Sequence, residues 1–164
     1  MKKIVIAISL FVNVSLCFAT PQIPDLLIIG KETFMLYSFP LEYLKLAKAP
    51  FDYRGYSFPG TACYRGYQAT WKILDNKLFL VHVNKVDSTK EELDIVKYLK
   101  ENNYSPTIIN GLVFADWYSA KFKYWDRWTT RFQNYIYSPI GNKILFPILE
   151  INDGYVIKNK LNAP

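Results

Sequence analysis

The strongest constraint on the fold is a pair of neighbouring sequence patterns. Apolar and polar residues alternate over positions 67–73, and an apolar run follows over positions 78–83. A period of two places successive side chains on opposite faces of a β-strand. Asp75 and Asn76, between the two runs, tolerate the left-handed backbone of a two-residue hairpin turn. The burial of one face predicts the register of this hairpin. The expected pairs are Leu74 with Lys77, Ile73 with Leu78, Lys72 with Phe79, Trp71 with Leu80, Ala69 with His82, Gln68 with Val83, and Tyr67 with Asn84.

Further short apolar runs surround other turn sequences. Gly30-Lys31, Asn110-Gly111 and Asp153-Gly154 each separate two strand-like segments. Pro147 would push the strand before the last turn to a sheet edge or a bulge. These runs predict a mainly β protein built from antiparallel strands.

One segment has the pattern of a helix. Ser88 and Glu91 have the spacing of a capping box, and an apolar stripe follows them. We therefore expect a small antiparallel barrel or sandwich with one inserted helix at about 88–102. The choice between barrel and sandwich stays open.

The N-terminal residues have the three parts of an export signal. Lys2 and Lys3 precede a mainly apolar run over residues 4–18, and Cys17-Phe18-Ala19 places small residues at a cleavage site. We expect a bacterial signal peptide over residues 1–19 and a single mainly β domain over residues 20–164, located in the periplasm or secreted. A lipoprotein with acylated Cys17 is disfavoured because Leu16, before it, is large.

Charge and cysteine content limit the partners. The formal net charge is +6, and would be +4 without Lys2 and Lys3, so nucleic acid is not an expected partner. No stable membrane span is expected after signal removal. Cys63 would be the one remaining cysteine, either buried or paired with another chain. One histidine and one cysteine fall short of a usual zinc ligand set, so we expect no metal and no cofactor.

Several phrases resemble a family of small β-rich bacterial proteins. They include Thr61-Ala62-Cys63-Tyr64-Arg65-Gly66-Tyr67, Ala69-Thr70-Trp71-Lys72-Ile73, Asp75-Asn76-Lys77-Leu78-Phe79-Leu80 and Phe114-Ala115-Asp116-Trp117. The resemblance covers about residues 23–119, and Ala120 stands where the family has glycine. It implies a domain type but no activity, because none is known for that family.

Four residues could belong to a site or serve the structure. His82 is the only histidine, and in the expected register it lies on the core face opposite Ala69, with Tyr67 diagonal to it. A structural imidazole is favoured over a proton-transfer residue because His82 matches no catalytic constellation. Asp116 lies among aromatic residues and needs a partner if buried, and Arg65 could grip it with two bonds. A structural ion pair is favoured over a catalytic acid.

Residues 121–135 are rich in aromatic and basic side chains. Aromatic stripes usually face a core, which is the favoured interpretation. Trp and Arg are also the usual anchors of interfaces, so the alternative is a binding face. Its candidate residues are Trp125, Arg127, Trp128, Arg131 and Phe132.

Taken together, the sequence favours a non-catalytic binding protein whose partner is a protein of the envelope, with an inhibitor or immunity-type role first. A cell-wall or glycan-binding module is the alternative. A hydrolase that uses His82, Asp116 and Arg65 is the third hypothesis.

Overall fold

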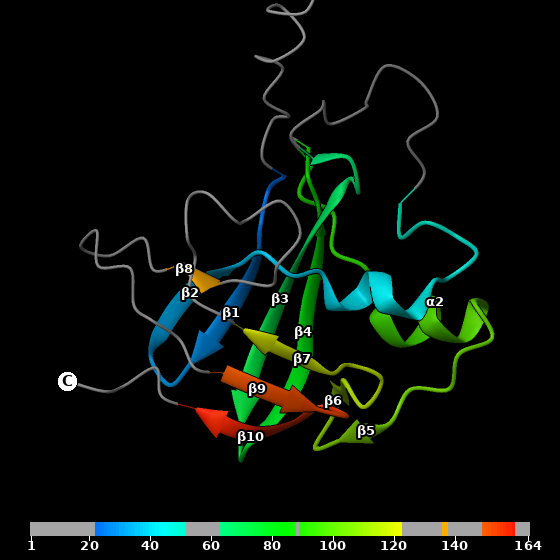
Figure 1. The fold of residues 1–164 in the computed structure, drawn as a ribbon. Coiled ribbons are helices and arrows are strands. Elements are labelled where there is room, and N and C mark those ends of the chain that lie inside the picture. Colours follow the sequence, from blue (N-terminus) through cyan, green and yellow to red (C-terminus); the bar gives the residue numbers. More distant parts are fainter. Residues whose placement is uncertain (1–21, 52–62, 88, 123–135, 138–148, 160–164) are drawn as a thin grey trace, which may run out of the picture.

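A computed structural model describes residues 22–51, 63–87, 89–122, 136–137 and 149–159 (Figure 1). The expected signal peptide, Pro147, and the candidate binding residues between positions 125 and 132 lie outside these ranges, so the interpretations placed on them stay predictions. Among the described residues, no helix has the length and hydrophobicity that a membrane crossing requires.

The expected mainly β fold is confirmed, with a sheet that curls into a half barrel (Figure 1). The strands follow the order β7-β9-β10-β4-β3-β1-β2-β8, and β6, which pairs with β5, also joins β4. Neighbouring strands are antiparallel except β1 and β3, which are parallel. The strand bounds are β1 Asp25–Ile29, β2 Glu32–Leu36, β3 Tyr67–Leu74, β4 Lys77–Lys85, β5 Ile108–Ile109, β6 Leu112–Phe114, β7 Ala120–Phe122, β8 Ile136–Tyr137, β9 Leu149–Asn152 and β10 Tyr155–Asn159.

The hairpin of β3 and β4 agrees with the predicted register for its first four pairs, from Leu74–Lys77 to Trp71–Leu80. Asp75 and Asn76 have φ angles of 47° and 56°, as the two-residue turn requires. A β-bulge then shifts the pairing by one residue. The predicted pairs beyond it are wrong: the observed pairs are Thr70 with His82, Ala69 with Val83, Gln68 with Asn84, and Tyr67 with Lys85.

The bulge coincides with a change of neighbours along the other edge of β4. Tyr155 of β10 pairs with Lys77, and β6 pairs with Phe79 and Leu80. Beyond the bulge, residues 91–93 take over, because Leu93 N donates to Val83 O at 2.9 Å. Three different segments therefore pair with one edge of a single strand.

The one α-helix of the described chain, α2, is shorter than expected and spans Ile95–Glu101. Asp94 caps it by accepting a hydrogen bond from Lys97 N at 3.0 Å. The expected start at Ser88 is wrong because Glu92, downstream of Ser88, forms a β-bridge with Asn84. Pairing with β4 thus outweighs the local capping pattern.

The remaining turns lie at the positions that the sequence predicted. Asn110-Gly111 and Asp153-Gly154 both have positive φ, and Gly30 has φ of 61° between β1 and β2. A short 3-10 helix, η1 (Pro40–Leu44), follows β2 and lies beside α2 in Figure 1, the first in cyan and the second in green.

The core lies inside the curl of the sheet, with Trp71, Leu27, Val83 and Leu99 all fully buried. Leu99 shows that α2 closes part of this core. A smaller aromatic contact joins Phe79, Phe114 and Tyr155, with ring centroids 5.8 and 5.1 Å apart.

Candidate functional site

A buried carboxylate stands at the start of β1. Asp25 is fully buried and accepts hydrogen bonds from Arg65 Nη1 at 2.9 Å, Ala69 N at 3.2 Å and Trp71 Nε1 at 3.0 Å. Burial raises the pKa of this carboxyl, and the Arg65 charge and the N–H donors oppose that shift. A buried charge is tolerated when it is paired and hydrogen-bonded in this way.

Arg65 connects this buried carboxylate to the surface. Its side chain is 8% exposed, and its Nη2 donates to Ile23 O at 2.8 Å. The guanidinium lies 3.8 Å from the ring centroid of Phe39 and 4.7 Å from that of Tyr67. These hydrogen bonds and ring contacts together hold the Arg65 guanidinium in place.

Tyr67 continues the same network outward. Its hydroxyl donates to the Glu42 carboxylate of η1 at 2.5 Å. Burial, with the nearby Glu42 charge, raises the pKa of Tyr67. β1, β3 and η1 are therefore joined by a chain of polar and cation–π contacts that runs from Asp25 through Arg65 and Tyr67 to Glu42.

A hollow of about 410 Å³ opens where η1, Arg65 and α2 meet, and we call it the Tyr98 groove. This volume is within the usual range of ligand pockets. Its lining combines aromatic, apolar and charged side chains. They are Tyr64, Tyr67, Tyr98, Leu41, Leu46, Ala49, Pro50, Glu42, Lys45, Lys48 and Arg65.

The walls of the Tyr98 groove are held together by hydrogen bonds. Tyr98 OH donates to Lys48 O at 2.8 Å, and Lys48 N donates to Asn102 Oδ1 at 2.8 Å. The end of α2 thereby holds the segment after η1 in place. Tyr64, in contrast, is 77% exposed, so its ring is accessible to a partner.

A second hollow, of about 430 Å³, shares Lys48, Ala49, Pro50 and Tyr98 with the first. It extends toward Lys85 and Lys97 and also toward Glu91 and Asp94. Its charges are mixed, so its lining indicates no single ligand class.

His82 does not lie on the core face, which corrects the predicted placement. The bulge before it turns its side chain to the outer face, where the side chain is 49% exposed. Its Nδ1 lies 2.5 Å from Glu92 Oε1. The buried position next to Ala69 belongs to Val83 instead.

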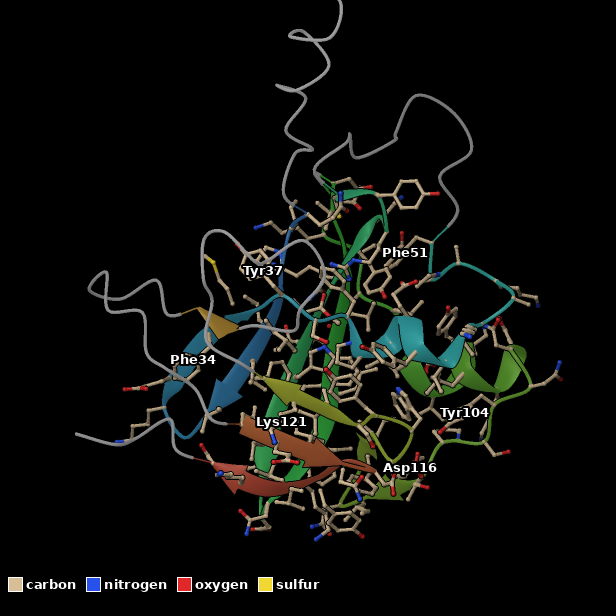
Figure 2. All side chains as sticks on the ribbon, in the orientation of Figure 1. Phe34, Tyr37, Phe51, Tyr104, Asp116 and Lys121 are labelled. Carbon is tan, nitrogen blue, oxygen red and sulfur yellow. The ribbon has the colours of Figure 1, made fainter. Side chains whose placement is uncertain are left out.

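Asp116 does not pair with Arg65, which corrects the expected partnership. Its carboxylate accepts hydrogen bonds from Tyr104 OH at 2.9 Å and Thr107 Oγ1 at 2.5 Å. Figure 2 shows Asp116 and Tyr104 close together beside the β5–β6 hairpin. Arg65 pairs with Asp25, so the two predicted residues belong to different clusters.

Cys63 is buried and unpaired, as the first of its two interpretations expected. Its Sγ lies 3.6 Å from Tyr67 O. Burial raises the pKa of the thiol, which disfavours the reactive thiolate. Within the described ranges, no three His, Cys, Asp or Glu side chains are grouped so that they could hold a metal ion.

Sequence reasoning found Arg65 and Tyr67 but missed Asp25 and Glu42. The signal for Asp25 was available, since it precedes the apolar run Leu26-Leu27-Ile28-Ile29. A carboxylate in such a run must be paired if buried, which is the argument that singled out Asp116. Glu42 carried no comparable signal, because its role depends on the position of η1.

Comparison of the chain with models of protein families, with curated proteins and with solved structures finds no match.

Proposed function

We propose that this chain is an exported, non-catalytic binding protein that holds a protein of the bacterial envelope in the Tyr98 groove, as an inhibitor or immunity-type protein. The observation that supports the proposal is the groove itself. It joins an accessible ring, Tyr64, to walls fixed by the buried Asp25–Arg65 pair and by Tyr98. Binding hot spots typically consist of aromatic and Arg side chains around a preformed hollow.

Preorganisation favours binding because little conformational entropy remains to be lost. Both Nη atoms of Arg65 and the hydroxyl of Tyr67 are engaged by Asp25, Ile23 and Glu42 before any partner arrives. A partner side chain that enters the groove would therefore meet a largely formed surface. The side chains of Arg65 and Tyr67 therefore lose little further freedom when a partner binds.

The test starts with capture of partners from envelope extract on the chain without residues 1–19. Each captured protein is purified, and its Kd is measured for the wild type and for Tyr64→Ala. Because Tyr64 is 77% exposed, this variant should fold as the wild type does. We expect a loss of affinity of at least about tenfold, as for a hot-spot residue.

Ile157→Ala is the matched control, because Ile157 is 61% exposed on β10, away from the groove. It should leave the Kd unchanged. A captured partner that binds wild type and Tyr64→Ala equally would refute the groove as the binding site.

A glycan is the second candidate partner, and the exposed Tyr64 ring is the observation that favours it. An accessible aromatic ring beside polar groups offers an apolar face together with hydrogen-bonding neighbours. Sedimentation with purified cell wall tests this function. We expect Tyr64→Phe to sediment with the cell wall as the wild type does, and Tyr64→Ala to remain in the supernatant. If the wild type does not sediment with the cell wall, a glycan-binding function is excluded.

A further inference from the structure

Positive charge predominates in the Tyr98 groove. Lys45 and Lys48 are exposed, and within the described part of the chain neither ammonium group lies within 4.0 Å of a carboxylate. Glu42 is the one carboxylate in the lining. The charge of Arg65 is matched by Asp25 behind it. Two lysines against one glutamate leave a single positive charge in excess.

The backbone that carries these two lysines is fixed. Lys45 ends η1 in a left-handed conformation, with φ of 49°, and its N donates to Glu42 O. Lys48 is held on both sides, through its N by Asn102 and through its O by Tyr98. The ammonium groups are therefore presented from an ordered segment, which lowers the entropy cost of gripping an anion.

Arg65, which also lines the groove, has one unsatisfied hydrogen-bond donor. Its Nε is buried and has no hydrogen-bond partner among the described residues, although Nη1 and Nη2 both have one. A buried N–H donor without an acceptor is unusual in a folded protein. Arg65 lines the groove, so this unsatisfied donor lies within the wall of the proposed binding site.

We propose that the Tyr98 groove takes a carboxylate of its partner together with a neighbouring apolar side chain. This inference rests on the proposed binding function. Lys45 and Lys48 hold the carboxylate, and Leu41, Leu46 and Pro50 contact the apolar group. The single excess charge matches a monoanion, and Glu42 opposes the second charge of a phosphate. The carboxylate comes either from an acidic side chain or from a chain terminus.

Three small probes test this chemistry by titration of backbone amide NMR signals in the full chain without residues 1–19. N-acetyl-leucine carries a terminal carboxylate, N-acetyl-aspartyl-leucinamide carries a side-chain carboxylate, and N-acetyl-leucinamide is neutral. We expect the amide signals of Lys45, Lys48 and Tyr64 to shift with at least one acidic probe. The neutral probe should bind about tenfold more weakly. The acidic probe that binds more tightly identifies the source of the carboxylate.

The variant Lys45→Gln/Lys48→Gln should weaken binding of the acidic probe by about tenfold, and added salt should weaken wild-type binding. Lys31→Gln is the control, because Lys31 is an exposed lysine in the β1–β2 turn, outside the groove. Equal affinity for acidic and neutral probes, or tighter binding of phenyl phosphate than of either acid, would overturn the proposal.

This result is separable from the proposed function. If the acidic probes fail to bind while a captured partner still loses affinity in Tyr64→Ala, the carboxylate inference fails and the binding function stands. If that partner is indifferent both to Tyr64→Ala and to the lysine substitutions, the groove is not the site and both proposals fail.

Discussion

The indole Nε1 of Trp71 donates a hydrogen bond of 3.0 Å to the carboxylate of Asp25, and both side chains are fully buried. The bond crosses between β1 and β3, which are the parallel pair of the sheet. Parallel pairs are slightly less stable per residue than antiparallel pairs. The shared carboxylate therefore adds a side-chain connection at the place where the sheet departs from antiparallel pairing.

Asp25→Ala should destabilise the domain by about 3–5 kcal/mol, because the Arg65 guanidinium would be left buried without its carboxylate. Trp71 Nε1 and Ala69 N would also lose their acceptor. Urea unfolding followed by circular dichroism measures the effect. Glu32→Ala, at an exposed position on β2, is the control and should leave the midpoint nearly unchanged.

Trp71→Ala should cost about 3–5 kcal/mol, the usual range for removal of a large buried aromatic side chain. Trp71→Phe should cost less, because it keeps most of the ring contacts and loses the hydrogen bond to Asp25. Thermal unfolding of the two variants is compared with that of Tyr64→Ala, which removes an exposed aromatic side chain. The comparison separates the loss of core packing from the loss of an aromatic residue as such. A Trp71→Ala midpoint equal to that of the wild type would contradict the core position.

The first half of the β3–β4 hairpin was predictable because its register depends on a local turn and a local alternation. The second half was not, because the bulge occurs where β4 exchanges β6 for residues 91–93 as its neighbour. That exchange is a tertiary event without a signature in the sequence of β4. His82 was misplaced for this reason alone.

The same pairing explains the helix. Ser88 and Glu91 have the spacing of a capping box, yet residues 91–93 pair with the open edge of β4 through a β-bridge and two backbone hydrogen bonds. Helix propensity and capping amount to about 1 kcal/mol, which backbone pairing and burial can exceed. The helix consequently begins after Asp94, the next residue that can cap it.

The sequence predicted that Arg65 forms an ion pair with a buried carboxylate, but it did not predict which carboxylate. Arg65 was expected to hold a buried carboxylate, and it does. Asp25 and Asp116 both stand beside apolar residues, so the sequence alone offers no means to choose between them. The choice is made by the parallel pairing that brings β1 next to β3.

Gly154→Ala should be more destabilising than Gly111→Ala, although both glycines follow an Asp or Asn in a two-residue turn. Their φ angles are nearly equal, at +77° and +79°, so the backbone strain of about 1–2 kcal/mol is common to both variants. A Cβ at Gly154 would lie 2.6 Å from Phe114 Cε2 and 2.7 Å from Ala115 O, whereas a Cβ at Gly111 would have no atom of the described residues within 4 Å apart from its chain neighbours. We expect about 1–3 kcal/mol of additional loss at Gly154. Urea midpoints measured side by side give the difference, and equal midpoints would show that the turn has room to move away from β6.

Tyr98→Phe should lower stability by about 1 kcal/mol at pH 8, because it removes the hydrogen bond from Tyr98 to Lys48 O. Tyr43→Phe, whose ring is 51% exposed, is the control and should have little effect at that pH.

The effect of Tyr98 should also depend on pH. Burial, reinforced by the Glu42 carboxylate, raises the pKa of Tyr98 from 10.0 to about 12. The folded state therefore holds this proton more tightly than the unfolded state, so the stabilisation is complete below pH 10 and is lost as the pH rises towards 12. The advantage of the wild type over Tyr98→Phe should be constant from pH 7 to 9.5 and should shrink by pH 11, as measured by urea unfolding at each pH. An advantage that grows over this alkaline range would mean that the folded state favours the ionised phenol, and the hydroxyl could not then be the donor that joins α2 to Lys48.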